Sequence, residues 1–142
     1  MSNYDTNFAD SIWRRASEHN FEAVFDVIES KTRLEPHQME TLCRHYISYI
    51  LLRSITGENL IVPHYYIGAF WSMHLMLPKD YREFCLNFGR AIIPKNPPNP
   101  DPGSIGWVKH HTRLREVTLA FYQDYIFAGS DYLPAVKRPS RR

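Results

Sequence analysis

The sequence contains only two cysteines, Cys43 and Cys85, which are too few for a disulfide scaffold. Long apolar runs are also missing: the longest end within about eight residues, whereas a membrane span needs about 20. The first ten residues, MSNYDTNFAD, have neither the basic start nor the apolar segment of a signal peptide. We therefore expect free thiols, a cytoplasmic location and no membrane contact.

The motifs of several enzyme classes are absent. The chain has no P-loop, no dinucleotide-binding glycine pattern, no C-x-x-C pair and no H-E-x-x-H metal motif. It also lacks the G-x-S-x-G turn of many hydrolases. These absences lean against an enzyme, and we expect no cofactor.

Most of the chain has no excess of positive charge. The net charge is +2, but four basic residues fall within the last six positions: Lys137, Arg138, Arg141 and Arg142. The remaining residues carry 13 Lys and Arg against 15 Asp and Glu, so they do not form a basic nucleic-acid platform. We expect one domain over residues 1–133 and a mobile basic tail over 134–142. The tail either contacts nucleic acid or an acidic partner through its charge, or is a solvated terminus.

The sequence does contain a helical pattern of apolar residues, and 14% of its 142 residues are aromatic. Apolar side chains repeat at helical spacing and never alternate as in a strand. They predict helical segments at about 8–28 (in two pieces), 36–55, 64–77, 78–88 and 104–128. The fold is therefore predicted to be all-α: an irregular bundle of five or six helices around the 39–55 helix, with a Pro-rich loop at 94–103. The predicted core comprises Leu42, Tyr46, Ile50, Phe70, Trp71, Phe84, Leu114, Phe121 and Tyr122.

One stretch, VPHYYIGAFWSMHLMLPKDYREFCLNFGRAIIPKNPP at 62–98, is the most distinctive part of the chain. Its spaced residues are Val62, Pro63, Trp71, His74, Leu75, Tyr81, Cys85, Gly89 and Pro97 or Pro98, followed later by Thr118, Leu119 and Tyr122. Over residues 40–135 this pattern resembles the glycine-rich domain-containing protein-like family. The resemblance implies a helical fold more than an activity.

Four positions depart from the pattern of that family. Gly68 stands where the family has Asp, and Ser72 stands where it has the first His of W-H-x-H. Ile93 and Pro94 replace a His-His pair. If the polar residues of the family bind a metal or transfer protons, this chain has lost most of them.

His74 is the best single candidate for function. One interpretation is a buried imidazole bonded to a Tyr or a backbone group, because a lone imidazole cannot supply the three or four ligands of a zinc site. The alternative is a metal site formed by His74, Cys85 and His111 or His110, with or without His64. A thiolate–imidazole pair of Cys85 with His74 is a further possibility, although an apolar setting makes a thiol inert.

Aromatic residues cluster just before and around His74. A binding surface is predicted from His64, Tyr65, Tyr66, Trp71, His74 and Tyr81, since Tyr and Trp are favoured at interfaces. Helical spacing of aromatics is more often typical of a core, so the 64–71 run is either core or interface.

Three functions remain open. The sequence favours a small non-enzymatic interaction module, an adaptor or an inhibitor of a larger assembly, which binds another protein through helix faces and the Pro-rich loop. The second is a metal-binding protein or enzyme centred on His74. The third is a nucleic-acid-associated protein that uses the basic tail. The identity of the partner and the oligomeric state do not follow from the sequence.

Overall fold

The computed structural model describes residues 6–90, 93–95 and 100–127, and the side chains from Phe8 onward. These ranges contain six helices and no strand, so the prediction of an all-α bundle is confirmed. The helices are α1 (Thr6–Ser17), α2 (Glu22–Lys31), α3 (Pro36–Thr56), α4 (Tyr65–Leu75), α5 (Pro78–Leu86) and α6 (Ile105–Tyr122). None of the described helices has the length and apolar character of a membrane-spanning segment.

Helix α3 is the centre of the bundle, as the sequence predicts. It begins with Pro36 at a position where the missing N–H costs nothing, and the backbone N–H of Glu35 donates to Gln38 Oε1 at 2.8 Å. It ends at Gly57, whose φ of 68° is left-handed and suits a residue without Cβ. Every residue from Tyr46 to Arg53 is buried, because neighbours cover α3 on most sides.

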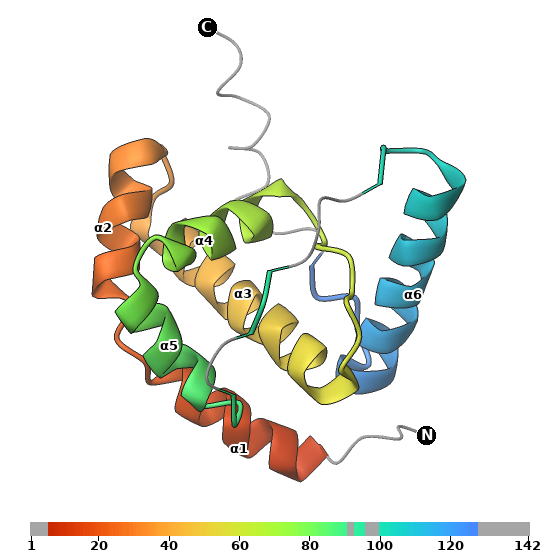
Figure 1. Cartoon of the computed structure of the whole chain (residues 1–142), viewed down its shortest axis with the longest axis horizontal. Coiled ribbons are helices and arrows are strands. Elements are labelled where there is room, and N and C mark those ends of the chain that lie inside the picture. Colours follow the sequence, from red (N-terminus) through yellow and green to blue (C-terminus); the bar gives the residue numbers. More distant parts are fainter. Residues whose placement is uncertain (1–5, 91–92, 96–99, 128–142) are drawn as a thin grey trace, which may run out of the picture.

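The other helices are arranged around α3 (Figure 1). Helices α1, α4 and α6 each pack against α3, while α2 packs on α4 and α5 follows α4 as its neighbour. Figure 1 places α1, α2, α4 and α5 together on one side of α3, and α6 alone on the other. The first side is therefore the more enclosed part of the molecule.

The predicted core residues are buried, except that Tyr122 is half-buried. Trp71 is fully covered, and its indole N–H donates to the hydroxyl of Tyr81 at 3.0 Å. That hydroxyl in turn donates to the carbonyl of Ile93, which lies at the start of the Pro-rich loop. The loop is also held by Arg53, which donates to the carbonyl of Pro94 at 2.7 Å. Residues 96–99 of the predicted 94–103 loop lie outside the described residues.

The end of the last helix differs from the prediction. Helix α6 ends at Tyr122 instead of near Ala128, with Gln123 in the left-handed region at φ 59°. The chain turns back here, which brings Phe127 into the core beside Tyr49 and His45 of α3. The burial of Phe127 against α3 explains the early end, because a straight continuation of the helix would carry it away from the core.

Candidate metal centre

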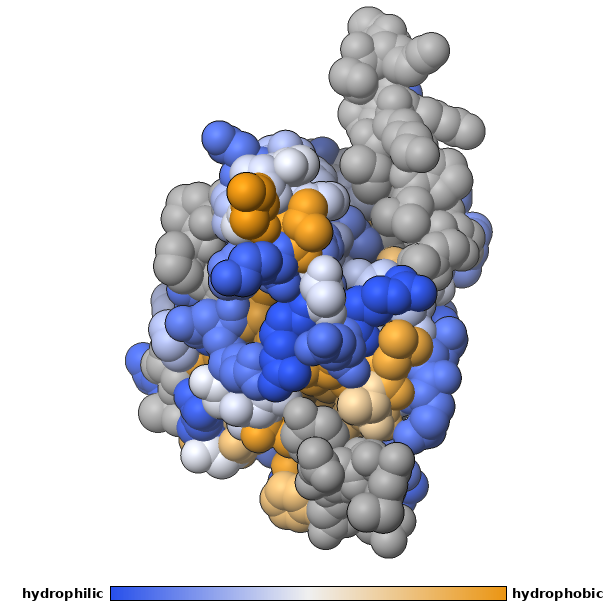
Figure 2. Space-filling view, turned by 90° about the vertical axis from the view of Figure 1, so that its right-hand side faces the viewer, coloured by the Kyte–Doolittle hydropathy of each residue, from blue (hydrophilic) through white to orange (hydrophobic). Residues whose placement is uncertain are grey.

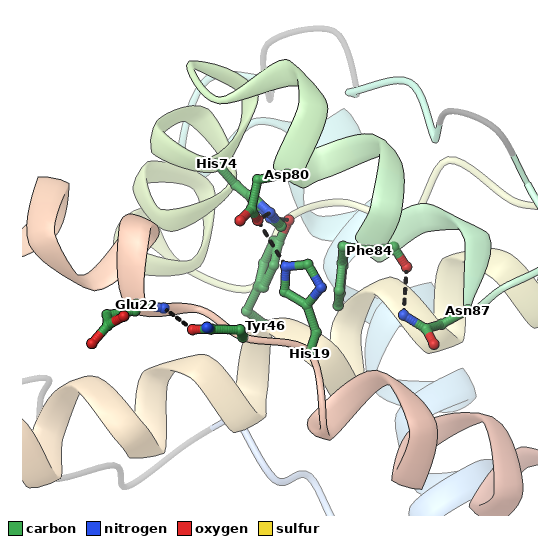
Figure 3. Close-up of polar contacts among 8 residues, drawn as sticks. His19, Glu22, Tyr46, His74, Asp80, Phe84 and Asn87 are labelled. Atoms are coloured by element: carbon green, nitrogen blue, oxygen red, sulfur yellow. Dashed lines mark hydrogen bonds and ion pairs between the residues drawn. The ribbon is translucent and has the colours of Figure 1, made fainter.

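Three polar side chains meet where the α1–α2 link passes the turn between α4 and α5. The Nε2 atoms of His19 and His74 each lie 2.7 Å from the same oxygen, Oδ1 of Asp80. On the far side of His74, its Nδ1 lies 2.8 Å from the hydroxyl of Tyr46, which comes from α3. Figure 3 shows the His19 ring pointing toward Asp80 and His74, with the Phe84 ring beside it. We call His19, His74 and Asp80 the triad.

Local structure places two members of the triad next to each other. His74 lies in the last turn of α4, and the N–H of Leu77 donates to its carbonyl at 2.9 Å. Pro78 then starts α5, and Asp80 is the acidic residue of its first turn, where a carboxylate interacts favourably with the helix dipole. His74 and Asp80 are six positions apart, and the tight turn between α4 and α5 brings the imidazole and the carboxylate together.

The third member comes from a distant part of the sequence. His19 follows α1 in a short link, where its N–H donates to the carbonyl of Ala16 at 3.1 Å. The link continues with Asn20, whose side-chain oxygen accepts a hydrogen bond from the N–H of Glu22 at 2.9 Å. These bonds position the His19 ring over the α4–α5 turn, 61 positions before Asp80.

Aromatic rings enclose the two histidines. The His74 ring packs against Phe84 and meets Tyr81 edge-on, with centroids 5.2 and 5.1 Å apart. The His19 ring meets Phe21 edge-on at 4.7 Å. His74 is fully buried, whereas 22% of the Asp80 side chain remains exposed. The triad thus has an apolar inner wall and reaches solvent through its carboxylate.

Burial determines the protonation state of His74. Desolvation lowers its pKa from 6.5 to about 4, although the neighbouring Asp80 acts in the opposite direction. Desolvation also raises the pKa of Tyr46 well above its ordinary value, so Tyr46 stays a phenol. The Tyr46 hydroxyl can therefore donate to Nδ1 of a neutral His74, whose Nε2–H then faces Asp80. A neutral imidazole is the form that binds metals.

The triad has the composition of a transition-metal site. Its three ligand atoms lie within 4.8 Å of one another. Among the described residues, the triad is the group of at least three His, Cys, Asp or Glu side chains that meets this distance. Zinc binds imidazole nitrogen and carboxylate oxygen at 2.0–2.2 Å, so tetrahedral ligands stand roughly 3.3 Å apart. The two 2.7 Å contacts to Asp80 need to open by only about 0.6 Å to accept such an ion.

The sequence-based interpretation of His74 was right in one part and wrong in its premise. A tyrosine does bond one ring nitrogen, as predicted. His74 is not a lone imidazole, however, because His19 and Asp80 lie beside it. The local sequence does point to Asp80, because an acidic residue two positions after the helix-starting Pro78 is expected in the first turn of α5. No local signal links His19 to this turn.

The alternative metal site of His74 with Cys85 and His111 is not formed, because these residues point to different neighbours. Cys85 is fully buried beside Tyr81 and the backbone of Ile93, and desolvation raises its pKa. An uncharged, enclosed thiol suits the core. His111 lies on α6 and packs against Trp107 with tilted rings, whose centroids are 4.2 Å apart.

The residues of the predicted binding surface separate into two groups. Tyr66, Trp71 and Tyr81 are buried and belong to the core. Tyr65 is 71% exposed, and His64 is half-buried just before α4. The aromatic run at 64–71 is therefore mostly core. The basic tail, with Lys137, Arg138, Arg141 and Arg142, lies outside the described residues.

No family model, curated protein or solved structure matches this chain. The resemblance to the glycine-rich domain-containing protein-like family therefore remains a prediction from the sequence, and the case for function rests on the geometry of the triad.

Proposed function

We propose that this protein binds a divalent transition-metal ion, with Zn²⁺ as the ion to test first, through His19, His74 and Asp80. The observation that carries the proposal is the convergence of two imidazole nitrogens and one carboxylate oxygen from three separate segments. Imidazole favours zinc, copper, iron or nickel, whereas magnesium and calcium prefer sites made of oxygen alone. The choice of ligands therefore favours a transition metal.

The surroundings of the triad support this function. With an ion on Nε2 of His74, the hydrogen of the neutral ring would be on Nδ1 and would face the hydroxyl of Tyr46, a contact of the kind that orients metal-bound histidines. His19, His74 and Asp80 would hold the ion, and the partly exposed Asp80 would leave room for water beside it. Bound zinc would supply a Lewis acid that lowers the pKa of a neighbouring water.

A competition titration tests the proposal. The full chain is stripped with a chelator and then titrated with Zn²⁺ against a coloured chelator. We expect one ion per chain, and an affinity at least about tenfold lower in His19→Gln and in Asp80→Asn, as for the loss of groups that support a metal. His110→Gln, which changes an exposed histidine of α6, is the matched control and keeps the affinity of the wild type.

Circular dichroism of each variant shows that it is folded. Uptake of less than one ion per chain, or equal affinities in all four proteins, contradicts the proposal. Replacement of Zn²⁺ by Co²⁺ adds a spectroscopic check, because the visible absorption of cobalt reports nitrogen and oxygen ligands. Mg²⁺ in excess leaves the titration unchanged if the ligand preference is as proposed.

A second candidate function is the protein-interaction module that the sequence favours, and one surface supports it. Ile105 and Val108 are 82% and 50% exposed on one side of α6, next to the basic Lys109. Figure 2 faces α6 and shows hydrophilic residues across the middle with separate hydrophobic residues above and beside them. A partner helix with apolar and acidic residues fits this surface.

Paired charge variants test the second candidate. Val108→Asp should lose a partner that the wild type and Leu86→Asp both retain, since Leu86 is similarly exposed but lies on α5. Retention of the same partner by all three proteins removes α6 as the interface.

A further inference from the structure

The triad joins two helix junctions that are far apart in the sequence. His19 belongs to the link between α1 and α2, whereas His74 and Asp80 flank the turn between α4 and α5. An ion bound by all three side chains would therefore connect the first pair of helices to the second. This position distinguishes the triad from a site contained within one helix or one loop.

The seam between α1 and α5 has few other polar connections. Helix α1 packs on α3, and its residues Ala9, Ile12 and Ala16 are buried. Polar contacts of α1 and its following link with α5 and its C-terminal turn include the bond from His19 to Asp80 and an exposed bond from Arg15 to the carbonyl of Asn87 at 3.2 Å.

The inner side of the same seam consists of aromatic rings. The rings of His19 and Phe21 rest against Phe84, with centroids 5.5 and 5.4 Å apart. Movement of the link would expose Phe21 and Phe84, which are now buried. The closed link is therefore held by this ring cluster and by the hydrogen bond from His19 to Asp80, with the exposed bond from Arg15 to Asn87 beside it.

Water and a metal ion act on this carboxylate in opposite ways. The carboxylate is partly exposed, so water competes for the hydrogen bonds that hold the link closed. An ion that needs His19 as its third ligand binds only the closed arrangement, and it shifts the population toward that arrangement by mass action.

We propose that metal occupancy of the triad regulates the α1–α2 link, which is locked against the α4–α5 turn when the ion is bound and opens locally when it is absent. The proposal rests on the proposed function, because it needs the ion to bind. It adds that the ion acts as a latch on the N-terminal helices. A local opening of this kind leaves the remaining helices in place.

Hydrogen exchange of the full chain, measured by mass spectrometry, tests the latch. The reporters are the N–H groups of Glu18 and His19, which bond Arg15 and Ala16, and that of Glu22, which bonds the Asn20 side chain. Zn²⁺ should slow exchange at these groups about tenfold relative to protein with chelator. The N–H groups of Val108 and Gln123 at the two ends of α6 are internal controls and keep their rates.

His19→Gln separates the latch from general stabilisation. This variant keeps His74 and Asp80 as a two-ligand site, so we expect no zinc-dependent protection of the link. Exchange that slows equally at the link and in α6, or in the variant as in the wild type, overturns the latch. Zinc uptake that needs His19 but leaves the link unprotected overturns the latch while metal binding stands. Absence of zinc uptake overturns both proposals.

Discussion

Two helices of this protein carry a tryptophan followed one turn later by a histidine, and the two pairs have different surroundings. On α4, Trp71 and His74 are fully buried, and His74 bonds Tyr46 and Asp80. On α6, Trp107 and His111 pack against each other with tilted rings, whose centroids are 4.2 Å apart, and both remain partly exposed. The local pattern is nearly the same, so the difference arises from what packs against each helix. A histidine becomes a candidate ligand here through its tertiary neighbours.

Of the residues in the two pairs, the tryptophans should differ most in their contribution to the free energy of unfolding. Trp71→Ala should lower the free energy of unfolding by about 3–5 kcal/mol, because it removes a fully buried side chain and leaves a cavity. Trp107→Ala should cost less than about 2 kcal/mol, since Trp107 is partly exposed and gains less from burial. Urea denaturation of both variants measures the two losses. Equal losses would mean that α6 is packed as tightly as α4.

The pH dependence of stability should also separate the pairs. Burial holds the pKa of His74 near 4 in the folded state, against 6.5 in the unfolded chain. The unfolded state therefore binds more protons between these values, and stability falls as pH drops from about 6.5 to 4. His74 contributes at most about 3 kcal/mol to this fall.

The variants His74→Gln and His111→Gln isolate the contribution of His74 to the pH dependence of stability. Urea denaturation at pH 7 and pH 4.5 should show a smaller pH effect in His74→Gln than in the wild type. His111→Gln should change the pH effect less, because His111 is more exposed and its pKa is lowered by a weaker desolvation. An unchanged pH effect in His74→Gln contradicts the assignment of the neutral imidazole.

At neutral pH the two histidines should differ by a smaller amount. His74→Gln should lower stability by about 1–3 kcal/mol, since it disturbs buried hydrogen bonds to Tyr46 and Asp80. His111→Gln should stay within about 0.5 kcal/mol, as for a surface change away from special features. Thermal melts without added metal give both values, and a larger loss for His111→Gln would reverse the comparison.

The fold could be predicted because it depends on local signals. Pro36 and Gly57 mark the ends of α3, and Pro78 separates α4 from α5. The end of α6 could not be predicted in the same way, because it depends on Phe127 returning to α3.

The same distinction explains what was missed in the site. The position of His74 one turn after Trp71 marks it as a candidate. Asp80 could be predicted to lie nearby, because it follows the helix-starting Pro78 in the first turn of α5. His19 is not, because no periodicity relates the α1–α2 link to a turn 61 positions later.

That separation has a thermodynamic consequence. His74 and Asp80 stand six positions apart, so even an unfolded chain brings them together with a small loss of entropy. Closing the much longer loop to His19 costs more conformational entropy, and packing of the helices has already met that cost in the folded protein. If an ion binds as proposed, an unfolded chain would offer it two of these ligands, whereas the folded chain offers three. The difference between the two binding free energies would then add to the stability of the folded state, so the ion would couple this turn to the packing of the helices.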